Sequence, residues 1–154
     1  MIHGGILSRT LQSISGVVPS GKTLPILLNY CVKLNGSQLV ITASDLETTI
    51  SVKLDLETVD AIGVKEVAIP AKIFSEIVSS LSSQQLIIDI KEDYSIEIKA
   101  DAGVYNLVGE SAESYPAEIT LENAEKSIFS SSVMSKAISK TIFSTDTTGI
   151  RPQM

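Results

Sequence analysis

Two hydrophobic periods alternate along this chain, and that alternation is the strongest constraint on its fold. In residues 49–55 every second side chain is apolar, as a half-buried β-strand requires. Around residues 6–18 the apolar side chains instead recur every three or four positions, which predicts a helix with one buried stripe. A chain that carries both periods must cover sheets with helices, so the pattern predicts an α+β fold.

Two further helices and several strands follow the same logic. One helix is predicted after Pro70, with Phe74, Val78 and Leu81 on its apolar stripe, and another after the serines at 130–132. Helices that recur about every 60–65 residues suggest duplicated units. Closely spaced strands are most simply joined as antiparallel hairpins. The remaining predicted strands are 26–34, 37–43, 64–69, 86–90, 96–98 and 104–108.

The chain length allows one well-buried domain and the beginning of another. Its 154 residues include a segment at 115–126, with Pro116 and several acidic residues, that is typical of a linker. We therefore expect a first domain at 1–120 and an incomplete second domain at 121–154, which the third helix would open.

The overall negative charge argues against binding of nucleic acid, but the distribution of the charges along the chain does not. The formal net charge is −6, from 18 acidic and 12 basic residues, yet only Glu76 and Asp146 fall in or beside the predicted helices. Opposite the apolar stripes lie cations and hydroxyls instead: Arg9, Ser13, Lys72, Ser79, Ser80, Ser83, Lys136 and Lys140. Such faces are either simply solvated, which the pattern alone favours, or suited to lie near phosphates without binding them tightly.

Residues 16–23 match the phosphate-binding pattern G-x-x-x-x-G-K-[ST] letter for letter. That loop binds phosphates when it follows a strand and opens a helix. Here it follows a predicted helix and leads into Leu24-Pro25-Ile26-Leu27, which reads as a strand. A nucleotidase built on Lys22 therefore stays a minor alternative, and the glycines more simply end a helix and shape a turn.

No other catalytic chemistry is indicated. With His3 and Cys31 as the sole histidine and cysteine, the chain offers no zinc cluster, histidine-based triad or internal disulfide. We expect no catalytic residue, no metal and no cofactor. Apolar runs such as residues 26–28 are too short to span a membrane, and no leader pattern opens the chain, so a cytoplasmic protein is expected.

Several ordered strings resemble one known family, the bacterial DNA polymerase III β subunit or sliding clamp. Each string is modestly specific, but together they keep the family's order over residues 6–154. The strings are Leu11-Gln12-Ser13-Ile14-Ser15-Gly16-Val17-Val18, Thr23-Leu24-Pro25-Ile26-Leu27, Thr42-Ala43-Ser44-Asp45-Leu46-Glu47, Ile69-Pro70-Ala71-Lys72, Glu113-Ser114-Tyr115-Pro116 and Phe143-Ser144-Thr145-Asp146-Thr147-Thr148-Gly149-Ile150-Arg151-Pro152.

The resemblance implies a DNA-clamp fold, with duplicated helix-plus-antiparallel-strand units, helices on the DNA-facing side and sheet outside. It implies a non-enzymatic processivity factor: a three-domain protomer that closes into a homodimeric ring around double-stranded DNA without sequence preference. Its partners would be DNA polymerase III and the clamp loader, through the full-length protein, whereas this fragment would be monomeric or weakly associating. The implied DNA-binding residues are Arg9, Lys22, Lys72, Lys136, Lys140, Thr148, Arg151 and Gln153, and the implied ring-interface residues are Tyr105 and Leu107.

The chain also departs from the family pattern. Gly21 stands where an arginine is usual, so that Lys22 is an imperfect substitute, and Ser79 replaces a frequent channel arginine. Ala102 and Val104 replace basic residues near the ring interface. The segment before residue 6 is too short for the family's opening strand, which is expected to be missing or altered. The pocket for polymerase and loader peptides lies between the second and third domains, and nearly all of it is absent. A structural α+β interaction module with a merely solvated helical face remains the other alternative.

Overall fold

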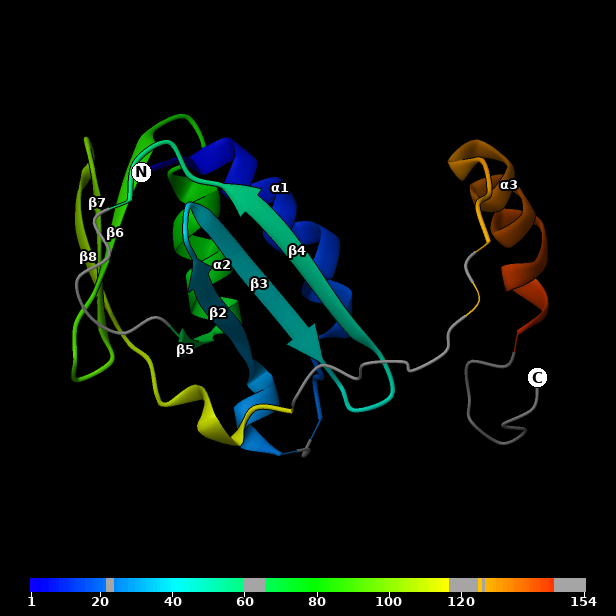
Figure 1. Ribbon diagram of the computed structural model, residues 1–154, viewed down its shortest axis with the longest axis horizontal. Helices are drawn as coiled ribbons and strands as arrows, with labels where there is room; N and C mark the ends of the chain where they lie inside the picture. Colours follow the sequence, from blue (N-terminus) through cyan, green and yellow to red (C-terminus); the bar gives the residue numbers. More distant parts are fainter. Residues whose placement is uncertain (22–23, 60–65, 117–124, 126, 146–154) are drawn as a thin grey trace. The chain divides into compact units, whose positions relative to one another are not determined.

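The chain divides into two compact units, Met1–Glu118 and Ile119–Met154, each of which is described here by itself. The structure is a computed structural model that describes residues 1–21, 24–59, 66–116, 125 and 127–145 (Figure 1). The boundary predicted between residues 120 and 121 lies outside the described residues and stays a prediction.

Two antiparallel four-stranded sheets form the larger unit (Figure 1). The first, named here the β3 sheet, has the strand order β4 (Thr49–Asp55), β3 (Gln38–Ser44), β2 (Asn29–Asn35) and β5 (Glu66–Pro70). The second, named the β7 sheet, has the order β1 (Ile2–His3), β6 (Gln85–Ile90), β7 (Ser95–Ala100) and β8 (Gly103–Val108).

The two sheets are joined where the chain leaves β8. The N–H of Ala68 donates to the carbonyl of Glu110 at 2.9 Å, and the N–H of Glu110 donates back to Ala68 at 3.0 Å. Gly109 permits this approach, because a Cβ there would lie 2.8 Å from the carbonyl oxygen of Ala68. A backbone bridge therefore connects β5 of one sheet to the end of the other.

The strand predictions hold over the described residues except at one place. Strand β5 covers the described part of the predicted strand 64–69 and ends one residue later, whereas residues 64 and 65 lie outside the described residues. β4 has the predicted bounds, and β3, β6, β7 and β8 differ from prediction by one or two residues. The strand expected at 26–34 is wrong over its first residues, since Pro25–Leu28 form a 3₁₀ helix and β2 begins at Asn29. Pro25 fixes φ near −65° and lacks an N–H, which suits the first position of a helical turn. Leu27 is then buried by that turn rather than by a strand.

The opening segment also differs from expectation. The strand that the sequence left as missing or altered is present as β1, only two residues long, with Ile2 opposite Leu86. Helix α1 (Gly4–Ile14) follows at once, and the imidazole Nδ1 of His3 accepts the N–H of Gly5 at 3.1 Å. The predicted helix at 6–18 thus begins earlier and ends earlier, with a 3₁₀ turn at Ser15–Val17.

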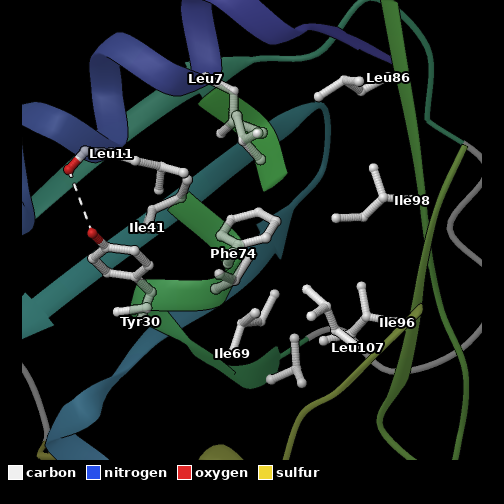
Figure 2. Packing of buried hydrophobic residues seen from close by; sticks show 14 of the residues in the cluster. Leu7, Leu11, Tyr30, Ile41, Ile69, Phe74, Leu86, Ile96, Ile98 and Leu107 are labelled. Carbon is white, nitrogen blue, oxygen red and sulfur yellow. Dashed lines mark hydrogen bonds between the residues drawn. The ribbon is translucent and has the colours of Figure 1, made fainter. Parts of the chain in front are cut away.

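One hydrophobic core lies between the helices and both sheets. Helix α2 (Ala71–Ser80) follows β5 directly and buries Phe74 and Val78. Figure 2 shows Phe74 surrounded by Leu7 and Leu11 of α1 and by side chains from both sheets. The Tyr30 hydroxyl lies 3.5 Å from the carbonyl of Leu11, at the limit of a hydrogen bond, and is 3.2 Å from the Ser75 hydroxyl. The helices are therefore held by their inner faces, and their outer faces remain in solvent.

The described part of the second unit contains one helix and the turn that follows it. Helix α3 (Ser131–Thr141) begins at the predicted serines, and a 3₁₀ turn at Ile142–Ser144 continues it. Its predicted apolar stripe is exposed, including Met134 and Ile138 at 40% and 51%. Nothing in the described part of this unit buries that stripe.

Candidate nucleic-acid interface

Helices α1 and α2 lie side by side and expose a shared outer face. Within the first unit these two helices pack along each other. Between them is a shallow hollow of about 510 Å³. It is lined by Ser8, Gln12, Ser75, Glu76, Ser79 and Ser80. Five of these six side chains are neutral and polar, so the hollow offers hydroxyls and an amide to a polar neighbour, together with one carboxylate.

Each of the two helices that line this hollow also carries one exposed cation. Arg9 of α1 and Lys72 of α2 are both exposed, as their predicted angles opposite the apolar stripes required. The Arg9 Nε donates to the carbonyl of Gly5 at 3.1 Å, which holds the start of the side chain along its own helix. Within the described residues no carboxylate lies within ion-pair distance of either cation. Their charges are available to an anion from solvent.

The other predicted DNA-binding residues belong to the second unit or lie outside the described residues. Lys136 and Lys140 are exposed one turn apart on α3. Lys22, Thr148, Arg151 and Gln153 fall outside the described residues, as does Asp146. Of the predicted set, Arg9 and Lys72 are therefore the two residues that lie on the packed helices of the first unit.

The phosphate-loop alternative does not fit the local structure. The described part of residues 16–23 follows helix α1, where a phosphate loop would follow a strand. The next element is the four-residue 3₁₀ helix Pro25–Leu28, which replaces the expected strand. Neither flanking element is the one that the loop requires.

The side chains of the predicted ring-interface residues lie on the face of the β7 sheet that packs against the hydrophobic core. Leu107 is buried at 8% exposure, and Tyr105 is partly buried against the core. Val104 and Val108 of the same strand are exposed at 56% and 77%, because successive side chains alternate between the two faces. Any contact of side chains at this strand would therefore use the even-numbered positions.

The backbone of β8 gives the same assignment. The N–H of Gly109 donates to the carbonyl of Tyr94 at 3.0 Å, on the β7 side. Backbone groups of an antiparallel strand alternate between its two neighbours, so the even-numbered residues of β8 direct theirs away from β7. Glu110 follows this rule, since its N–H bonds Ala68 on that other side. Val104, Asn106 and Val108 thus present their N–H and C=O groups at the free edge of the sheet.

The described titratable groups with shifted pKa values do not line the hollow between α1 and α2, although the hydroxyl of Tyr30 contacts Ser75 of that lining. Burial raises the pKa of the Tyr115 phenol to about 12 and also raises the pKa of Tyr30. Hydrogen bonds to Asp89 and Glu97 raise the pKa of Lys99 on the outer face of the β7 sheet. Among the described residues no group of three histidine, cysteine or acidic side chains could hold a metal ion. No described helix is long and apolar enough to cross a membrane.

The sequence patterns did not predict a strap, residues 110–116, that lies against the outer face of the β3 sheet. Residues 110–116 cross that face, where the Asn29 amide donates to Glu110 Oε1 at 2.6 Å. The Tyr115 hydroxyl donates to the carbonyls of Asn29 and Thr42, both at 3.3 Å. Cys31 is buried beneath the strap at 8% exposure and packs there with Ala68, Ala112 and Tyr115. The partners of Tyr115 lie 73 and 86 residues away, so no local pattern could have shown them.

Solved structures with the same fold define the class of protein. A crystal structure of the DNA polymerase sliding clamp from Bacillus subtilis matches with a TM-score of 0.85 and 24% identity, over 98% of this chain and 41% of that one. The DNA polymerase III subunit beta from Pseudomonas aeruginosa matches with a TM-score of 0.80 and 28% identity, over 97% of this chain and 40% of that one. The fold is the α+β fold of sliding clamps, as the resemblance implied.

The sequence comparisons identify the family. A family profile described as "DNA polymerase III beta subunit, N-terminal domain" matches residues 2–122. The curated beta sliding clamp of Halalkalibacterium halodurans is 26% identical over 99% of this chain, and that of Pseudomonas aeruginosa is 34% identical over 84%. The chain spans 41% and 34% of those two proteins. It belongs to the DNA polymerase III beta subunit family, the beta sliding clamps.

Proposed function

We propose that this chain forms part of a sliding clamp that encircles duplex DNA and tethers the replicative polymerase to it. In this proposal it has no catalytic role and acts in the cytoplasm, where the chromosome is. A closed ring turns dissociation of the polymerase into local rebinding at high effective concentration. The family membership supports this function, and the chain would supply the first domain and the start of the second.

The face formed by α1 and α2 is the observation that carries the proposal. Arg9 and Lys72 project into solvent without carboxylate partners among the described residues, and the hollow between their helices is lined by five neutral polar side chains and one carboxylate. Phosphate affinity grows with the number of phosphates neutralised, so two separated cations give weak attraction without fixing the DNA. Such a surface suits a ring that slides. By analogy of position, Lys136 and Lys140 would extend the surface from the second unit, together with Lys22, Thr148, Arg151 and Gln153.

The assembly of the ring is part of the same proposal. The free edge of β8 would pair with the third domain of a second protomer, through the backbone of Val104, Asn106 and Val108. Tyr105 and Leu107 would support that strand from the core side instead of meeting the partner directly. Polymerase III and the clamp loader would bind elsewhere in the full-length protein.

Fluorescence anisotropy of a short labelled DNA duplex tests the helical face. We expect weak binding that falls steeply between about 50 and 200 mM salt and is the same for unrelated sequences. Arg9→Ala and Lys72→Ala should each lower the slope of log K against log salt by up to about 0.9, because each contact with a phosphate releases about one counterion. Lys53→Ala, which removes an exposed lysine from the sheet side, is the matched control.

The outcomes separate the two remaining candidates. Equal slopes for Arg9→Ala, Lys72→Ala and Lys53→Ala would show that the helical face is merely solvated, as in a structural interaction module. Magnesium-dependent ATP binding that Lys22→Ala abolishes would instead support the nucleotidase. Loss of slope in the two helix variants alone supports the clamp.

A further inference from the structure

Glu76 is the one acidic residue of helices α1 and α2, and it lies in the hollow between them. Its side chain is exposed, and no hydrogen bond or ion pair joins it to another described residue. Lys72 lies one turn earlier on the same face of α2, but the two side chains do not form an ion pair. The carboxylate therefore stands in the proposed DNA-facing surface with its charge uncompensated.

The stability of helix α2 does not account for this carboxylate. An acidic residue stabilises a helix in its first turn, where it meets the positive end of the dipole, whereas Glu76 lies in the middle of Ala71–Ser80. A lysine four residues before a glutamate is also the less favourable order of such a pair. Glutamine would serve equally well as a polar, helix-compatible side chain in the hollow.

We propose that Glu76 weakens the hold of this face on DNA, so that its carboxylate opposes the attraction of Arg9 and Lys72 for phosphates. The inference rests on the proposed clamp function and assigns a repulsive role to one residue of the surface. The other five lining side chains are uncharged. Glu76 is thus the residue in the hollow whose charge determines how far the attraction is cancelled.

The expected size follows from Coulomb's law. Two unit charges about 7 Å apart in water change an equilibrium constant by roughly twofold to threefold. A carboxylate in the hollow faces more than one phosphate, so its removal should raise DNA affinity about twofold to fivefold at low salt. The screening length is about 10 Å at 0.1 M, so this gain should shrink as salt rises.

The test is the anisotropy titration with the full chain and the same DNA duplex. Glu76→Gln should bind about twofold to fivefold more tightly than the unaltered chain at the lowest salt, and Glu76→Lys more tightly still. Glu113→Gln is the matched control, since Glu113 is exposed and lies on the strap side of the β3 sheet, away from the helices. Each glutamine variant raises the formal net charge of −6 by one, so a general charge effect would move both equally. Circular dichroism confirms that each variant folds.

Each outcome bears on a different part of the argument. Tighter binding by Glu76→Gln but not by Glu113→Gln supports the repulsive role. Equal changes in both variants, or weaker binding by Glu76→Gln, overturn it. If Lys72→Ala weakens binding while Glu76→Gln changes nothing, the inference fails and the clamp surface stands. If neither Lys72→Ala nor Glu76→Gln alters DNA binding, the helices α1 and α2 do not form the DNA-facing surface.

Discussion

Ionisation of Tyr115 should set the stability of the first unit in alkaline solution. The phenol is 8% exposed, and its hydroxyl donates to the carbonyls of Asn29 and Thr42 at 3.3 Å. Burial, with a smaller contribution from the charge of Cys31, raises its pKa from 10.0 to about 12. The folded state therefore favours the neutral phenol. The free energy of unfolding that depends on the neutral phenol is fully present below pH 10 and is lost as pH rises toward 12, because Tyr115 ionises at a lower pH in the unfolded chain than in the folded one.

The magnitude follows from linkage. Each pH unit between the two pKa values costs about 1.4 kcal/mol, so the unaltered chain should lose about 1.4 kcal/mol from this group between about pH 8 and about pH 11. Tyr115→Phe removes the hydroxyl and should cost about 1 kcal/mol at about pH 8, through the lost hydrogen bonds to Asn29 and Thr42. The variant cannot ionise at this position. Its disadvantage should therefore vanish or reverse by about pH 11.

Urea unfolding followed by circular dichroism at the two pH values measures both free energies. Burial also raises the pKa of Tyr30, and this phenol is present in both proteins, so its own burial affects both free energies. Tyr105→Phe controls for the loss of one tyrosine. A stability difference between the unaltered chain and Tyr115→Phe that is the same at both pH values would refute the reasoning.

Two further predictions concern packing. Gly4→Ala should cost about 1–3 kcal/mol, because the added Cβ would collide with the backbone carbonyl of Leu81, whereas Gly16→Ala has open space and should stay within about 0.5 kcal/mol. Urea midpoints compare the pair, and equal costs would contradict the close approach of α1 to the end of α2. Leu107→Ala should cost about 2–4 kcal/mol and Val108→Ala less than about 0.5 kcal/mol, since the first side chain is buried and the second is 77% exposed. If Val108→Ala lowered the thermal unfolding temperature more than Leu107→Ala did, the assignment of odd-numbered β8 side chains to the core face would be wrong.

The hydrophobic period alone was sufficient to predict the helices and strands that have one buried and one exposed face. The alternation in residues 49–55 gave β4 its bounds, and the stripe of Leu7, Leu11 and Ile14 placed α1 against the core. The same method gave a wrong prediction for Leu24-Pro25-Ile26-Leu27, because a short apolar run has no period that separates a strand from a helical turn. Proline chemistry was the signal that could have corrected it.

The candidate site was predictable in part for a related reason. The exposure of Arg9 and Lys72 follows from helical angle alone. The hollow around Glu76 does not, since it requires α1 and α2 to lie side by side, which only their packing decides. At β8 the resemblance supplied Tyr105 and Leu107 as interface residues, and that role stays a prediction. The face of the strand on which each side chain lies could not be predicted, because it depends on register, and a shift of one residue exchanges the two faces.

The bridge between Ala68 and Glu110 gives the first unit a definite path for mechanical load. A force that pulls outward on the free edge of β8 reaches β7 along one side of the strand. It also reaches β5 through two backbone hydrogen bonds at 2.9 and 3.0 Å. From β5 the load passes to β2 along their paired backbones. A tension applied at this edge is therefore shared by both sheets, and a strand β8 peeled from its Gly103 end remains tied to β5 until the bridge also breaks.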